Sequence, residues 1–144
     1  MLLVRMKIVT INLSYYNQES TLKEHILQWK SYSRELKELL NFCIVDDCSL
    51  RNAKDVLHDV DLSDIDIEIY RVKQDLVCNI AGVRNLAATV CKTEWMVILD
   101  MDTMIPEYLG REIINLAKLK EPFFKKILPD RKKRCYKFNR RVPD

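Results

Sequence analysis

Short apolar runs that suit buried strands alternate along this chain with segments in which apolar residues recur at helical spacing. The strand-like runs, rich in β-branched and aliphatic residues, are residues 7–13, 42–45, 65–69 and 95–99. The segments with helical spacing are residues 20–40, 53–58 and 83–90, and Pro106 suits the first position of another helix. This alternation predicts an α/β fold, with a mostly parallel sheet, right-handed crossovers and flanking helices.

Composition excludes several classes of protein. The chain holds only two glycines, so it contains neither a G-x-G-x-x-G dinucleotide loop nor a Walker-type phosphate loop. No apolar run approaches the ~20 residues that a membrane span needs, and the N-terminus lacks the apolar region and cleavage site of a signal peptide. The five cysteines include no C-x-x-C pair, which disfavours a zinc site or a disulfide framework. We therefore expect a cytoplasmic globular protein.

Charge is unevenly spread between the body of the chain and its C-terminal end. Residues 125–144 hold nine Lys or Arg against two Asp, a net charge of +7, which leaves −4 on residues 1–124 for the total of +3. We therefore divide the chain into a globular domain, residues 1–124, and a basic C-terminal segment, residues 125–144. Such asymmetry indicates an anionic partner or a flexible basic tail. A solvated segment is the favoured interpretation, and no nucleic-acid partner is expected.

Two acidic clusters directly follow apolar strands. They are Asp46-Asp47 and Asp100-Met101-Asp102. Ligands of open parallel sheets bind beyond the carboxyl ends of the strands, so both clusters are expected at one crevice. Two carboxylates one residue apart repel each other unless a cation lies between them, and a hard divalent cation such as Mg²⁺ or Mn²⁺ satisfies both. The clusters therefore predict a metal that bridges the phosphates of a nucleotide, with turn and helix capping as the alternative interpretation.

Four segments of the chain match one known family in order and spacing, over residues 7 to 110. The segments are Ser14-Tyr15-Tyr16-Asn17, Ile44-Val45-Asp46-Asp47-Cys48-Ser49, Asn79-Ile80-Ala81-Gly82-Val83-Arg84-Asn85 and Trp95 to Asp102. Together they resemble the donor half of the family-2 glycosyltransferases, which have the Rossmann-like GT-A fold. The family counterparts are a Tyr-Asn pair, V-D-D-G-S, N-x-x-G-x-x-R-N (one residue shorter here) and the D-x-D motif.

On the nucleoside side, the resemblance implies that Ser14 and Tyr16 contact the donor. It also implies that Asp46, with Asp47, accepts a hydrogen bond from the base or the ribose. A carboxylate is an acceptor only, which suits the imide N–H of a pyrimidine or guanine.

On the diphosphate side, the resemblance implies that Arg84 faces the phosphates, which its charged, bidentate guanidinium fits well. Asp100 is expected at the ribose or the metal, and Asp102 is the main ligand of Mn²⁺ or Mg²⁺. The function implied is metal-dependent transfer of a sugar from a nucleotide-diphosphate sugar to the hydroxyl of a sugar or glycan acceptor, with inversion.

Two departures from the family pattern affect these expectations. Cys48 stands where the family usually has Gly, so this turn must avoid positive φ or accept strain. The family's acceptor half normally continues well beyond the D-x-D motif, but only 42 residues follow Asp102 here. None of their carboxylates has the context of a catalytic base, so no general base is assigned. We expect either a piece of a longer enzyme or a minimal variant completed by a second copy or a partner subunit.

Two other functions fit parts of the same pattern. A catalytically inactive nucleotide-binding remnant, serving as an interaction module, would carry the same donor-half residues. A haloacid-dehalogenase-type phosphatase would use Asp100 as a nucleophile in D-x-D-x-T, but Thr103 comes one position early and no acidic pair follows. Finally, His25 and His58 adjoin neither acidic cluster, and both are expected at the surface.

Overall fold

The computed structural model describes residues 6–76 and 79–127 of the chain. Within these ranges the strands are β1 (Val9–Tyr15), β2 (Leu40–Asp46), β3 (Ile67–Arg71) and β4 (Trp95–Leu99). The helices are α1 (Glu19–Ser31), α2 (Arg34–Lys37), α3 (Ala53–Val56), α4 (Ile80–Val90) and α5 (Glu107–Ile127). Strands and helices alternate as the sequence pattern predicts. Most of the predicted basic segment, residues 128–144, lies outside the described residues.

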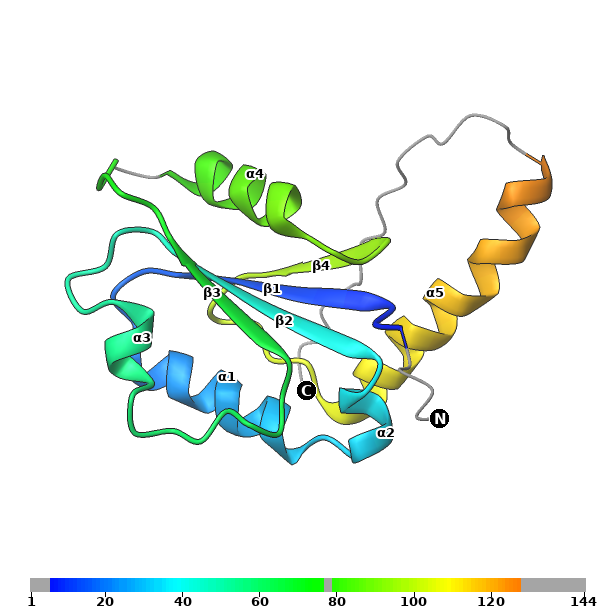
Figure 1. Cartoon of the computed structure of the whole chain (residues 1–144), viewed down its shortest axis with the longest axis horizontal. Helices are drawn as coiled ribbons and strands as arrows, with labels where there is room; N and C mark the ends of the chain where they lie inside the picture. Colours follow the sequence, from blue (N-terminus) through cyan, green and yellow to red (C-terminus); the bar gives the residue numbers. More distant parts are fainter. Residues whose placement is uncertain (1–5, 77–78, 128–144) are drawn as a thin grey trace, which may run out of the picture.

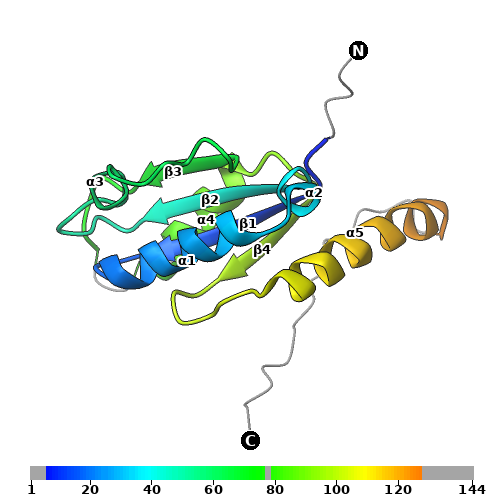
Figure 2. The ribbon, with the colours of Figure 1, turned by 90° about the horizontal axis from the view of Figure 1, so that it is seen from below.

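The strands form one parallel sheet in the order β3-β2-β1-β4. Figure 1 shows α4 on one side of this sheet and α1 and α3 on the other. Figure 2, seen from below, shows α1 lying along the sheet. The predicted α/β fold, a mostly parallel sheet flanked by helices, is confirmed. Because all the strands run in the same direction, the loops that follow β1, β2 and β4 meet at one edge.

Two apolar clusters hold the helices against the two faces of the sheet. On the α1 face, alternate residues of β1 are fully buried in the larger cluster: Val9, Ile11, Leu13 and Tyr15. Trp29 of α1 stacks on Phe42 of β2 with ring centroids 4.5 Å apart, which fixes the helix over the central strands. On the opposite face, Val45 and Val83 belong to a smaller cluster beneath α4. Burying one such side chain stabilises the fold by roughly 1.5–3 kcal/mol.

His25 lies in the larger cluster, so the expectation that it lies at the surface is wrong. Its side chain is fully buried on the stripe of α1 that also carries Leu22, Ile26 and Trp29. Its Nε2 donates a hydrogen bond to the carbonyl of Met101 at 2.9 Å. Burial lowers the pKa of the imidazole, so the ring is neutral near pH 7. The polar residues next to His25 in the sequence suggested exposure, whereas its helical spacing places it on the buried stripe.

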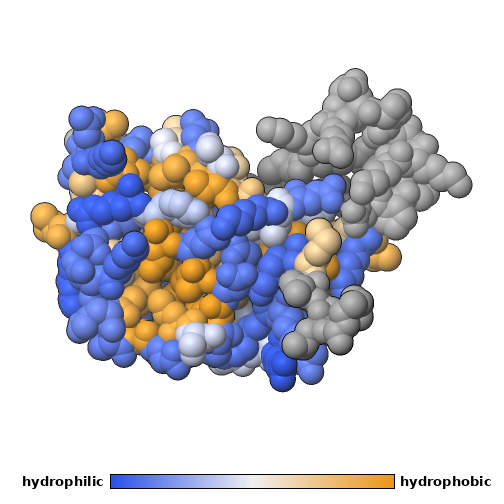
Figure 3. Space-filling model, in the orientation of Figure 1, coloured by the Kyte–Doolittle hydropathy of each residue, from blue (hydrophilic) through white to orange (hydrophobic). Residues whose placement is uncertain are grey.

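The visible surface in Figure 3 is mostly polar, with one larger apolar region between β3 and α1. The strand β3 is itself only half-buried over most of its length. In the part of the chain that the structure describes, no helix combines the length and the apolar character needed to cross a membrane.

Candidate functional site

An open cleft of about 190 Å³ lies at the carboxyl edge of the sheet. It is lined by the ends of β1, β2 and β4 with the loops that follow them, and by the first turn of α4. The lining residues come from all four segments: Ser14, Tyr15, Tyr16, Gln18, Asp47, Ile80, Val83, Asp100 and Met101. Four residues that the sequence predicted as donor contacts are in this lining. Three others, Asp46, Arg84 and Asp102, lie outside it.

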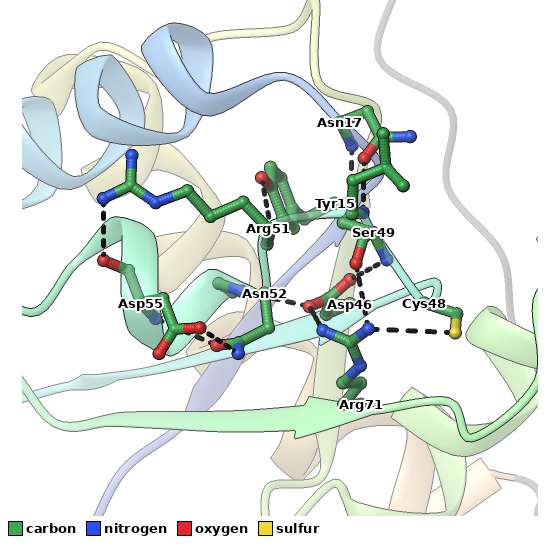
Figure 4. A network of polar contacts seen from close by, with 11 residues as sticks. Tyr15, Asn17, Asp46, Cys48, Ser49, Arg51, Asn52, Asp55 and Arg71 are labelled. Carbon is green, nitrogen blue, oxygen red and sulfur yellow. Dashed lines mark hydrogen bonds and ion pairs between the residues drawn. The ribbon is translucent and has the colours of Figure 1, made fainter.

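Asp46 is buried beneath the cleft, with only 1 % of its side chain exposed. One carboxylate oxygen accepts the amide of Ser49 at 2.8 Å, and the other accepts the amide of Ala53 at 3.0 Å. The guanidinium of Arg71, which comes from the end of β3, lies 3.4 Å from the second oxygen. Figure 4 shows Ser49 and Arg71 beside the Asp46 carboxylate. Asp46 therefore fixes the turn that follows β2.

This turn contains a strained residue and is tied to the loop after β1. Cys48 has φ of 60°, in the left-handed region that disfavours residues other than Gly. From the sequence, this turn had either to avoid positive φ or to accept strain at Cys48, and the structure shows positive φ. Asn17, also left-handed, donates its amide to the Ser49 hydroxyl at 3.1 Å and accepts the Leu50 amide at 2.8 Å. The guanidinium of Arg71 also stabilises the turn, because it donates a hydrogen bond to the Ser49 carbonyl at 2.9 Å.

Asp47, the next residue after Asp46, lines the cleft. The Asn79 side chain donates to its Oδ1 at 3.4 Å, and its backbone amide donates to the Tyr15 carbonyl at 2.9 Å. Asn79 reaches this position because Gly82 lacks a side chain: a Cβ on Gly82 would lie 2.3 Å from Asn79 Oδ1. The N-x-x-G spacing thus has a steric reason, since the glycine leaves room for a side chain that meets Asp47.

Tyr16 and Ser14 border the cleft from the end of β1. Tyr16 is 44 % exposed, and its hydroxyl donates to Asp75 Oδ2 at 3.3 Å. The charge of Asp75 raises the pKa of this hydroxyl. Tyr16 therefore stays protonated at neutral pH, with its hydroxyl donated to Asp75.

Asp100 and Asp102 follow β4 on either side of Met101. The side chain of Asp100 is 70 % exposed and pairs with Arg84 of α4, at 3.1 Å between Oδ1 and Nη2. Asp102 is exposed, and its Oδ1 accepts the Thr103 hydroxyl at 3.2 Å. Among the described residues, no three histidine, cysteine or carboxylate side chains converge as a complete metal site. Two carboxylates leave the other positions of a hard divalent cation to water, other oxygen atoms or a bound molecule.

Sequence reasoning missed Arg71, which holds the turn that carries Asp47. The alternation of Ile67 and Ile69 with polar residues indicated only a half-buried strand. A usable signal was present, because Arg71 is the last residue of β3 and pairs in register with Asp46. A cation at the carboxyl end of the strand next to an acidic cluster is positioned to neutralise it.

The fold is shared with solved structures of other proteins. The chain is similar to the crystal structure of S. aureus TarS 1-349, with 16 % identity, a TM-score of 0.63 and coverage of 79 % of this chain and 33 % of that chain. For the same TarS segment in complex with UDP-GlcNAc, the identity is 17 % and the TM-score is 0.60, and the match covers 79 % of this chain and 32 % of that chain. The chain is also similar to the mannosyltransferase PcManGT from Pyrobaculum calidifontis in complex with GDP-Man and Mn²⁺, with 19 % identity and a TM-score of 0.62. This match covers 82 % of this chain and 34 % of that chain. The chain thus spans about a third of the length of these structures.

Family membership comes from the sequence match. The model described as glycosyl transferase family 2 matches residues 10–123, which is most of the chain. Among curated protein sequences, none matches the chain. The matched region contains all four segments that carry the resemblance, so the haloacid-dehalogenase alternative is set aside. On the evidence of this match, the chain belongs to glycosyl transferase family 2.

Proposed function

We propose that the cleft binds the nucleoside diphosphate of a sugar donor, and that the chain is the donor-binding part of a metal-dependent glycosyltransferase. The supporting observation is the convergence of residues that are far apart in the sequence. Ser14, Tyr16, Asp47 and Asp100 line one cleft at the carboxyl edge of a parallel sheet. Ligands of open parallel sheets bind at this edge.

The base of the nucleotide is proposed to meet Asp47. Its carboxylate lines the cleft and, as an acceptor, suits an imide N–H of uracil or guanine. Ser14 and Tyr16 offer hydroxyl groups to the nucleoside from the end of β1. Asp46 acts from beneath the cleft, because it holds the turn on which Asp47 stands.

Asp102, together with Asp100, is proposed to hold Mn²⁺ or Mg²⁺. Both aspartates are exposed and have carboxylate oxygens, and these hard cations prefer oxygen ligands. Mg²⁺ is typically held by one or two carboxylates plus substrate phosphates, which suits a site where the described residues bring no third histidine, cysteine or carboxylate side chain together with these two. The complex of PcManGT with GDP-Man and Mn²⁺ supports the choice of ion. When bound, such an ion neutralises charge on the departing diphosphate.

Arg84 is proposed to turn from Asp100 to the diphosphate when the donor binds. Both partners of this ion pair are well exposed, at 43 % and 70 %. An exposed pair of this kind contributes ~1 kcal/mol or less. Charge-assisted, bidentate hydrogen bonds from arginine to phosphate are stronger, so the exchange of partners is favourable.

The reaction proposed is sugar transfer with inversion. The acceptor hydroxyl attacks the anomeric carbon while the bond to the diphosphate breaks, and a general base takes the hydroxyl proton. The residues assigned here hold the donor: Asp47 orients the nucleoside, and Arg84 orients the leaving diphosphate.

Titration calorimetry with UDP, GDP and CDP, each with and without Mn²⁺, tests this proposal. We expect one nucleotide to bind in a metal-dependent manner, and Asp102→Ala to weaken that binding by at least about tenfold. The matched control is Glu112→Gln, which neutralises an exposed carboxylate of α5 outside the cleft and should leave the affinity unchanged. If none of the three nucleotides binds under either condition, the proposal is wrong.

An inactive nucleotide-binding remnant is the second candidate, because such a protein would bind the donor through the same cleft residues. Incubation with UDP-GlcNAc or GDP-Man and Mn²⁺ separates the two candidates. Slow release of UDP or GDP that disappears in Asp102→Ala supports the enzyme. Tight binding without release supports the remnant.

A further inference from the structure

Two side chains of α1 and that of Tyr32, the next residue after α1, fasten the loop that carries Asp100-Met101-Asp102. His25 donates through Nε2 to the carbonyl of Met101 at 2.9 Å. One turn further along, Gln28 accepts the amide of Ile105 at 3.2 Å. Tyr32, which follows α1 directly, donates its hydroxyl to the carbonyl of the same Ile105. Figures 1 and 2 both place the chain between β4 and α5 beside α1. The loop is therefore held to the helix at both of its ends.

Two of these contacts are buried, where water cannot replace a lost hydrogen bond. His25 is fully buried, and only 3 % of Tyr32 is exposed. Burial lowers the pKa of the His25 imidazole and raises the pKa of the Tyr32 hydroxyl, so both side chains are neutral donors near pH 7. The spacing i, i+3, i+7 brings His25, Gln28 and Tyr32 to one side of the helix.

His25 is an unfavourable choice for a position that only fills the core. Its Nε2 donates to a carbonyl, so Nδ1 of the neutral ring carries no proton and is an acceptor. This buried Nδ1 has no hydrogen-bond partner among the described residues, which costs stability. An aliphatic residue, as at the neighbouring Leu22 and Ile26, would avoid that cost. A histidine at this position fits a role in fixing the loop.

Met101 connects the two aspartates of the motif. Its side chain is only 7 % exposed and belongs to the larger apolar cluster, and its carbonyl is bound by His25. With side chain and carbonyl both held, the backbone carries Asp100 and Asp102 on either side of a fixed point. We propose that His25, Gln28 and Tyr32 are positioning residues, which hold this loop so that both carboxylates meet the metal and diphosphate together. The inference rests on the proposed function of the cleft.

The first part of the test measures the loop itself, without any ligand. Backbone amide hydrogen exchange is followed at Ile105, whose amide donates to Gln28, and at Thr103, whose amide donates to the Asp100 carbonyl. We expect His25→Leu and Gln28→Leu to accelerate exchange at these amides by roughly tenfold or more, because the loop opens locally. Tyr32→Phe keeps the ring and its packing, so it tests the same point if the leucine variants fail to fold.

The second part measures what the loop does. The affinity of each variant for UDP and GDP is titrated in the presence of Mn²⁺. We expect a loss of roughly fivefold to tenfold in His25→Leu. His25→Gln, whose side-chain amide offers an N–H in place of Nε2, should recover most of the affinity. The matched control is Val56→Ala, which removes buried apolar atoms from α3 but none of the loop's polar contacts, and should bind normally.

The outcomes separate the inference from the proposed function. Faster loop exchange with weaker nucleotide binding, both recovered by His25→Gln, supports the positioning role. If the loop amides exchange at the wild-type rate in these variants, the side chains do not hold the loop. If the amides exchange faster but the nucleotide affinity is unchanged, the side chains hold the loop but have no positioning role. If the wild type binds neither nucleotide, the proposed function fails and the positioning role fails with it. In that case the exchange rates still show whether α1 holds the loop.

Discussion

Replacing Asp46 by Asn should strongly destabilise the chain, whereas the same change at Asp47 should not. Asp46 accepts two backbone amides, at 2.8 Å from Ser49 and 3.0 Å from Ala53, and its second oxygen also faces Arg71. Asparagine keeps one acceptor and places an NH₂ group at the other position. The NH₂ group then faces the backbone amide of Ser49 or Ala53, and this amide is left without an acceptor.

The magnitude follows from these contacts. Losing one hydrogen bond to a buried charged group costs about 1.5–3 kcal/mol, and leaving a buried donor unpaired adds about 1 kcal/mol or more. The pair with Arg71 adds little, because that guanidinium is 41 % exposed. The total is about 3 kcal/mol, which lowers the Tm of a domain of this size by roughly 10 °C.

Urea unfolding followed by circular dichroism, together with calorimetric melting, measures the effect. Asp47→Asn is the matched control. The hydrogen bond from the Asn79 side chain to Asp47 is long, at 3.4 Å, so the free energy of unfolding of Asp47→Asn should differ from that of the wild type by less than ~0.5 kcal/mol. The reasoning is refuted if Asp46→Asn is as stable as Asp47→Asn. It also fails if Asp47→Asn leaves nucleotide affinity intact while Asp46→Asn abolishes it without loss of stability.

Three further predictions concern other parts of the site. Cys48→Gly should stabilise the chain by roughly 0.5–1 kcal/mol in urea unfolding, because relief of the left-handed strain exceeds the entropic cost of glycine; a loss of stability would contradict this. The folded pKa of His25 lies below 6.5 because of burial, only partly offset by the Met101 carbonyl and the charge of Glu24. The unfolded state therefore binds more protons, and the stability due to this group is present above pH 6.5 and lost as the pH falls through 6.5 towards the folded pKa. His25→Gln should remove that part of the pH dependence in melts between pH 5 and 8, and identical profiles would exclude it. Arg84→Ala should weaken binding of UDP or GDP several-fold more than binding of the parent nucleoside, and equal losses in calorimetry would remove Arg84 from the diphosphate site.

Much of the fold could be predicted because the decisive signals are local. The apolar runs ending at Val45 and Leu99 fix both the strands and the loops that follow them. In a parallel sheet these loops must meet at one edge, so Asp47 and Asp100 were predicted on the same side. The structure brings both into the lining of one cleft.

The distinction between Asp46 and Asp47 depends on the pleat of β2. Phe42 and Ile44 belong to the larger apolar cluster, while Val45 belongs to the cluster beneath α4. By the same alternation, Asp46 points to the face of Phe42 and Ile44. Counting parity along the strand would have indicated that the two adjacent aspartates differ in environment.

His25 escaped prediction for a different reason. Its residue type and sequence neighbours suggest a surface, but Leu22, His25, Ile26 and Trp29 follow the helical pattern i, i+3, i+4, i+7. Its partner, the carbonyl of Met101, lies 76 residues away. Every residue has a backbone carbonyl, so the residue type at position 101 does not identify this partner, and the contact could be found only from the structure.

The central claim is that the cleft at the carboxyl edge of the sheet binds a nucleoside diphosphate and its metal. Its most direct test is NMR titration of the ¹⁵N-labelled chain with Mg²⁺ and UDP or GDP, following every backbone amide. We predict shifts that require both metal and nucleotide and that concentrate in residues 14–18, 47–49, 79–84 and 100–105. Shifts confined to the opposite edge of the sheet, or none with either nucleotide, would contradict the claim.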